Sequence, residues 1–163
     1  MKFSTKYLVQ AALLAAVYAT LTLLLKPFGY GPIQFRLAEA LTVLPAIFPA
    51  SIPGLFIGCI LANLLGGFGP VDIIFGSLAT LLAAISTYLL RKHRYLFPVP
   101  PVLFNALIVG SYVYLLYDQT YPLPLTMLFI GISEFILSFG LGLPLISFIK
   151  NNAGLRRSLG IDK

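Results

Sequence analysis

Long apolar runs separated by short polar stretches dominate this sequence. A helix needs about 20 mostly apolar residues to cross the hydrocarbon core of a bilayer, which is about 30 Å thick. Six runs approach that length before charges, prolines or glycines interrupt them, and they cover residues 7–25, 33–48, 52–68, 71–90, 99–117 and 123–149. The pattern therefore predicts an all-α integral membrane protein with six transmembrane helices in a single domain, residues 1–163.

The composition agrees with a membrane protein and excludes several other classes. Hydrophobic residues make up 59% of the chain and charged residues 10%, and the mean hydropathy is +0.96. An ordinary soluble domain has about 45–50% apolar and about 25% charged residues, so too little polar surface remains here for a water-soluble fold. Cys59 is the single cysteine, which excludes a scaffold of intrachain disulfides.

The net charge of +6 comes from basic residues at the ends of the apolar runs, which does not favour a nucleic acid as partner. With a cytoplasmic N-terminus, six crossings place most Lys and Arg residues inside, and only Lys26 and Arg36 near the outer face. We therefore expect both termini in the cytoplasm. Lysines before an apolar run also occur in signal peptides, but this run continues to Leu25, so we expect a retained helix.

The chain lacks the motifs of an enzyme or of an ATPase. No Gly-rich loop ending in Gly-Lys-Ser/Thr is present, so the chain is not expected to bind and hydrolyse ATP by itself. His93 is the single histidine and lies in a basic loop, which argues against a His-rich metal site or a serine triad. We therefore expect no catalysis, no cofactor and no metal. If the chain is a transporter, it must take its energy from an ion gradient or from a partner protein.

Alanines in the first run form a flat face. Ala11, Ala15 and Ala19 fall on one helical stripe, with Ala12 and Ala16 beside it. Small residues at this spacing let another membrane helix approach closely, so the face serves either internal packing or the docking of a partner membrane protein. Gly54 and Gly58 form a similar pair in the third run, where we expect internal packing.

Carboxylates are rare in this chain and therefore informative. Of five acidic residues, Glu39, Asp72, Asp118 and Glu134 fall within the expected bundle or its outer half. Glu134 lies in the middle of the last run, where a charged side chain costs about 2.5–3.5 kcal/mol on insertion scales. Hydrogen bonds to Ser or Asn side chains are one compensation, but we favour contact with a ligand or ion.

Other polar residues are candidates for the same site, each with a structural alternative. Arg36 and Glu39 are three residues apart, so they form a local ion pair or border an outward-opening pocket that also receives Gln34 and Tyr30. Asp72 follows a Gly-rich turn and is placed to cap the next helix. The remaining candidates are the embedded amides of Asn63 and Asn105, which satisfy the helix backbone or contact substrate, and Tyr112.

Four blocks of the sequence resemble the QueT family of predicted queuosine-precursor transporters. They are residues 34–45 (QFRLAEALTVLP), 52–59 (IPGLFIGC), 62–67 (ANLLGG) and 72–80 (DIIFGSLAT). The resemblance implies a six-helix substrate-binding (S) component of an energy-coupling factor (ECF) transporter in the bacterial cell membrane. In that family plan a transmembrane T component and two cytoplasmic ATPases drive uptake, and the first-helix alanines, Ala12 and Ala16 above all, contact the T component.

The resemblance implies a deazaguanine as substrate, either the aminomethyl or cyano precursor of queuosine or the base queuine. Glu134 and Asp72 are expected to accept its N–H groups or balance an aminomethyl cation, with Asn63 or Asn105 at the exocyclic oxygen and Tyr30 or Tyr112 stacking. Three alternatives stay open: an S component for another vitamin, a stand-alone carrier driven by protons or sodium, and a membrane enzyme or structural subunit. The last would need a reactive group of residues or a fixed complex, and the sequence shows neither.

Overall fold

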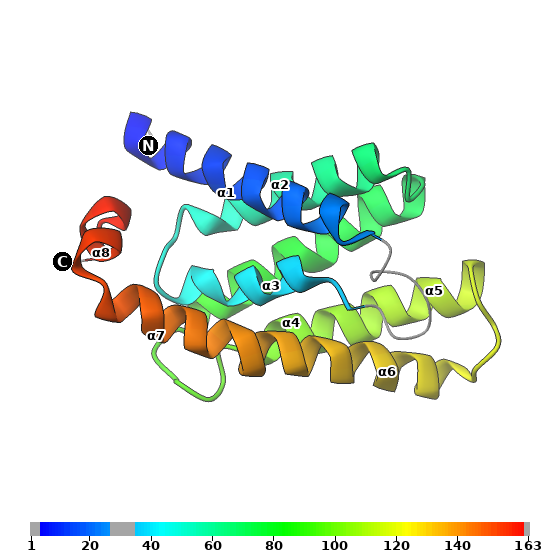
Figure 1. Cartoon of the computed structure of the whole chain (residues 1–163). Coiled ribbons are helices and arrows are strands. Elements are labelled where there is room, and N and C mark those ends of the chain that lie inside the picture. The colour runs from blue at the N-terminus through cyan, green and yellow to red at the C-terminus, as the bar shows by residue number, and fades with distance from the viewer. Residues whose placement is uncertain (1–3, 27–34, 162–163) are drawn as a thin grey trace.

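The computed structural model describes residues 4–26 and 35–161, and within these ranges all regular structure is helical. Figure 1 shows helices that run roughly side by side along one direction. The elements in chain order are α1 (Thr5–Leu24), η2 (Leu37–Ala46), α2 (Ser51–Gly66), η3 (Asp72–Gly76), α3 (Ser77–Leu89), α4 (Val99–Phe104), η4 (Asn105–Val109), α5 (Gly110–Leu116), α6 (Leu123–Phe135), η5 (Ile136–Gly142), α7 (Leu143–Asn151) and α8 (Ala153–Leu159).

Four continuous helical rods are long and apolar enough to cross a membrane, which confirms the prediction of a multi-pass helical membrane protein. They are Thr5–Leu24, Asp72–Leu89, Val99–Leu116 and Leu123–Asn151. The other two predicted runs contain shorter apolar helices, η2 and α2. The 16 residues of α2 extend about 24 Å at 1.5 Å per residue, and the 3₁₀ helix η2 extends about 20 Å.

A seam of small residues joins α1 to α2. A Cβ atom added to Gly54 would lie 2.8 Å from the carbonyl oxygen of Ala11, and one added to Gly58 would lie 2.9 Å from that of Ala15. Both contacts advance by four residues in the same direction, so α1 and α2 run parallel (Figure 1). The expected internal packing of Gly54 and Gly58 is therefore confirmed.

The same seam corrects the expected docking face of α1. Ala11, Ala15 and Ala19 are buried within this chain, so they are not available to a partner. Ala12 and Ala16 are exposed beside the seam. Of the five alanines predicted to dock a partner membrane protein, only these two are exposed. That they dock a partner stays a prediction.

The short helix η2 lies in the interior of the bundle. Ala38 and Val43 are fully buried on it, and the glycine at position 142 of η5 lies so close that an added Cβ would be 2.7 Å from a methyl group of Val43. Pro45 sits inside η2 and cannot donate a backbone hydrogen bond, which is compatible with a short helix of tight pitch. This placement brings the first turn of η2, with Glu39, into the protein core.

The bundle has two distinct ends (Figure 1). The start of α1, the loop over residues 90–98, the end of α7 and α8 lie at one end, which we call the terminal end. The α2–η3 turn and the α5–α6 loop lie at the other, which we call the loop end.

Candidate functional site

An ion pair within the bundle joins the start of η2 to the start of η3. The Arg36 guanidinium lies 3.5 Å from Oδ1 of Asp72, and the two side chains are only 10% and 7% exposed. The hydroxyl of Tyr112, from α5, donates to the same Asp72 oxygen at 2.9 Å. One carboxylate therefore ties together three segments that are far apart in the sequence.

This arrangement corrects two expectations about Arg36 and Asp72. Asp72 does not cap the following helix, because the residue at the N-cap position is Val71 and the Asp72 carboxylate faces Arg36 and Tyr112 instead. The local ion pair between Arg36 and Glu39 is not formed either. Packing of η2 against its neighbours directs Arg36 across to Asp72 and Glu39 toward α1.

Asn63 and Phe68 complete this part of the site. The Asn63 side chain donates to the backbone carbonyl of Asp72 at 2.8 Å, so this amide satisfies a helix backbone group, as one of the two predictions for it stated. The hydrogen bond fixes the start of η3 against α2. The Phe68 ring lies 5.2 Å from the Arg36 guanidinium and 5.6 Å from the Lys26 ammonium, within the range of cation–π attraction.

Two buried glutamates form the second part of the site. Glu39 is 3% exposed and Glu134, on α6, is 6% exposed. One oxygen of Glu39 accepts a hydrogen bond from the hydroxyl of Tyr18 on α1. Glu134 interacts electrostatically with Glu39 and Arg36, and Asn105 on η4 lies beside both carboxyl groups.

Several polar atoms of these residues have no hydrogen-bond partner within residues 4–26 and 35–161. They are Oε2 of Glu39, Oε2 of Glu134, Nδ2 of Asn105, Oδ1 of Asn63 and Nε of Arg36. Buried polar groups are nearly always paired, since an unpaired one costs about 1–3 kcal/mol. The atoms include both donors and acceptors, so the arrangement suits a small polar molecule that carries both kinds of group.

The helices that carry the site contain π-helical segments. Asp72 and Asn105 are the first residues of η3 and η4, and η5 begins two residues after Glu134. A π-helical turn contains one more residue than an α-helical turn, and this changes the direction of nearby side chains. Such turns frequently mark functional sites. Here the three π-helical segments lie within the three helical rods that supply Asp72, Asn105 and Glu134.

The structure thus brings seven of the nine predicted substrate-binding residues into one region: Arg36, Glu39, Asn63, Asp72, Asn105, Tyr112 and Glu134. The other two, Tyr30 and Gln34, lie outside the described residues. Asp118, a further carboxylate of the outer half, lies in the exposed α5–α6 loop. There hydrogen bonds from the Thr120 side chain and from the Thr120 N–H, which donates to Oδ1 at 2.8 Å, lower the pKa of Asp118.

The sequence did not single out Tyr18, which donates a hydrogen bond to Glu39, or the buried hydroxyl groups of Ser77 and Ser138. Tyr18 is 1% exposed, and the hydroxyls of Ser77 and Ser138 are buried with no partner in the described part of the chain. The available signal for Tyr18 was its position seven residues after Ala11 and three after Ala15, which puts it on the buried stripe of α1.

Comparison with known proteins agrees with the resemblance seen in the sequence. The family model described as "QueT transporter" matches residues 8–151. A protein of Lactococcus lactis subsp. cremoris (strain MG1363), described as "Queuosine precursor transporter QueT", is 41% identical over 85 residues. That match covers 50% of this chain and 50% of the relative, so it spans half the relative's length. No solved structure matches.

Proposed function

This chain belongs to the QueT transporter family, and on that premise we propose that it captures a deazaguanine precursor of queuosine as the S component of an ECF importer. The observation that carries the substrate proposal is the pair of buried glutamates whose Oε2 atoms have no partner among the described residues, beside the unpartnered amide of Asn105. These are the groups that a guanine-like edge requires.

Glu134 is proposed to accept the two adjacent N–H groups of the guanine-like edge. A carboxylate accepts such a pair in bidentate fashion, and hydrogen bonds to a charged group are worth about 1.5–3 kcal/mol each. Asn105 then donates to the exocyclic oxygen, and Asn63 Oδ1 supplies a further acceptor. Tyr112 is proposed to stack on the ring or border it.

Glu39 takes the role of second carboxylate in this proposal. Asp72 was the first expectation for that role, but its Oδ1 is already engaged by Arg36 and Tyr112. We therefore propose Asp72 as a positioning residue that holds Arg36. Arg36 and, across the Phe68 ring, Lys26 are the cations near the three carboxyl groups, and a cationic aminomethyl group would be attracted to the two glutamates.

The proposed topology has six crossings, with η2 and α2 as the two short ones, and both termini in the cytoplasm. The concentration of Lys and Arg at the terminal end supports that orientation. The Arg36–Asp72 pair, beside the α2–η3 turn at the loop end, then lies toward the extracellular face. The proposed location is the cell membrane of a bacterium, since the apolar helical rods suit a membrane and the similar protein comes from the bacterium Lactococcus lactis.

The proposed partners are a transmembrane T component and two cytoplasmic ATPases. Ala12 and Ala16 support this proposal, because they are exposed on α1 between large apolar side chains such as Leu13 and Val17, also exposed. Such small residues leave a shallow groove into which a partner helix fits closely.

Uptake by proteoliposomes tests the S-component role against a stand-alone carrier. The chain is reconstituted with radiolabelled aminomethyl-deazaguanine outside, in three forms: alone, alone with an imposed proton or sodium gradient, and together with T and ATPase subunits plus internal ATP. The proposal predicts accumulation in the third form alone. Accumulation driven by a gradient without the ATPases would instead identify an ion-coupled carrier.

A further inference from the structure

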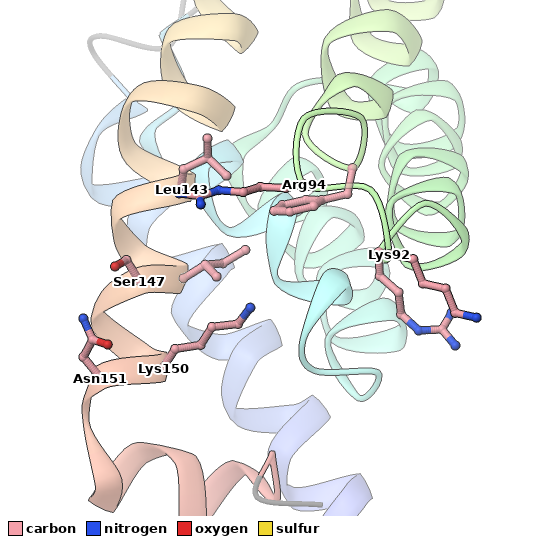
Figure 2. A pocket seen from close by; sticks show the side chains of 9 residues that line it. Lys92, Arg94, Leu143, Ser147, Lys150 and Asn151 are labelled. Atoms are coloured by element: carbon pink, nitrogen blue, oxygen red, sulfur yellow. The ribbon is translucent and has the colours of Figure 1, made fainter.

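A basic pocket lies at the terminal end of the bundle, away from the glutamates. It has a volume of about 420 Å³ and opens between the loop that follows α3 and the helix α7 (Figure 2). The polar part of its lining consists of Arg91, Lys92, Arg94, Ser147, Lys150 and Asn151. Among the residues that the structure describes, none that lines the pocket is acidic.

Three of the cations around this pocket have no counter-charge among residues 4–26 and 35–161. Arg91 is engaged elsewhere, since its guanidinium lies 3.9 Å from the centre of the Tyr88 ring and donates to the Tyr88 carbonyl at 2.8 Å. Lys92, Arg94 and Lys150 have no hydrogen-bond or ion-pair partner within the part of the chain that the structure describes. Figure 2 shows Arg94 and Lys150 reaching into the same gap from opposite sides.

This set of side chains matches the chemistry of a phosphate group. Arg94 offers a planar fork of donors, the lysines offer point charges, and the Ser147 hydroxyl and the Asn151 amide add neutral donors. Unpaired like charges that share one pocket repel each other, and an anion between them removes that repulsion. Basic pockets between membrane helices on the cytoplasmic side are suited to anionic headgroups.

The apolar part of the pocket indicates which source of phosphate fits best. Phe97 of the loop and Leu143 and Ile146 of α7 also line the pocket, and they belong to the apolar cluster at this end of the bundle. A free phosphate ion has no apolar group that could pack against these side chains. A phospholipid does, because its glycerol and first acyl carbons lie beside its phosphate.

We propose that this pocket binds the phosphate group of an anionic phospholipid. The site is separate from the substrate site and does not depend on the identity of the substrate. Bound lipid would hold the loop over residues 90–98 against α7.

The test uses the full chain in detergent micelles, titrated with phosphatidylglycerol, with phosphatidylcholine and with inorganic phosphate, and thermal unfolding is followed by circular dichroism. The pocket variant is the double substitution Arg94→Gln and Lys150→Gln. The matched control is Lys6→Gln with Arg157→Gln, which removes the same two charges at the same end of the bundle, outside the pocket. Comparable unfolding temperatures without lipid show that both variants are folded.

Phosphatidylglycerol is expected to raise the unfolding temperature of the native chain and of the control, with an apparent Kd at least about tenfold weaker in the pocket variant. If inorganic phosphate raises the unfolding temperature in the same way, and the pocket variant loses that response, the pocket binds phosphate. Its natural ligand would then be soluble phosphate and not a lipid. Equal losses in both variants, or an unchanged response of the pocket variant, would overturn the proposal. If the pocket variant fails to fold, the single Lys150→Gln variant against Lys6→Gln repeats the comparison.

Discussion

Arg36 and Asp72 form an ion pair 3.5 Å long, although 36 residues separate them in the chain. The pair joins η2, which carries Glu39, to η3, which is packed against α2 through Asn63. It thereby fixes one side of the polar region in which Glu39 and Glu134 lie.

Arg36 and Asp72 are predicted to be energetically coupled. In a double-mutant cycle of Arg36→Gln and Asp72→Asn, unfolding in detergent should give a coupling free energy between about 0.5 and 3 kcal/mol, because each single change leaves a buried charge unpaired. Arg36→Gln with Asp118→Asn is the control cycle, since Asp118 is in the exposed loop. Additive effects in both cycles would mean that the ion pair does not stabilise the fold.

Glu134→Gln is predicted to weaken the binding of aminomethyl-deazaguanine by about 10-fold to 100-fold, because the Gln amide has one acceptor oxygen and cannot accept two adjacent N–H groups as a carboxylate does. Asp118→Asn removes a carboxylate outside the site and should bind as the native chain does. Equilibrium dialysis with labelled ligand measures both. If Glu134→Gln binds within about twofold of the native chain, Glu134 does not contact the substrate.

Gly58→Ala is predicted to destabilise the protein by about 1–3 kcal/mol, because the added methyl would lie 2.9 Å from the Ala15 carbonyl oxygen and from Cβ of Tyr18. The helix contact at Gly58 positions Tyr18, which donates to Glu39, so ligand binding should weaken too. Gly140→Ala is the control, since its nearest neighbouring atom is 3.9 Å away. Thermal unfolding in detergent should separate the two variants, and equal stability would show that the α1–α2 seam tolerates a wider spacing.

Ala16→Trp is predicted to abolish co-purification with a T component while leaving deazaguanine binding unchanged, because a large side chain fills the groove on exposed α1. Leu107→Trp places the same large side chain at an exposed position on another helical rod and should co-purify normally. An affinity tag on the T component provides the measurement. Retention of Ala16→Trp at native levels would move the docking surface away from this face.

The sequence predicts where helices lie much better than how their side chains meet. Periodicity and length located the apolar rods, because burial in lipid depends on composition along one segment. The rotation of each helix about its axis depends on its neighbours, so the pairing of Arg36 with Asp72 rather than Glu39 could not be predicted. The π-helical segments at Asp72 and Asn105 also rotate side chains away from their ideal helical positions.

Calorimetric titration of the purified single chain with the two deazaguanine precursors and queuine shows whether this chain alone captures a deazaguanine, with guanine, thiamine and riboflavin as controls. A substrate-binding component should bind one molecule of a deazaguanine per chain saturably, without any ATPase subunit present, and give no heat with thiamine or riboflavin. Binding of a vitamin in place of every deazaguanine, or silence from all ligands in folded protein, would contradict that role.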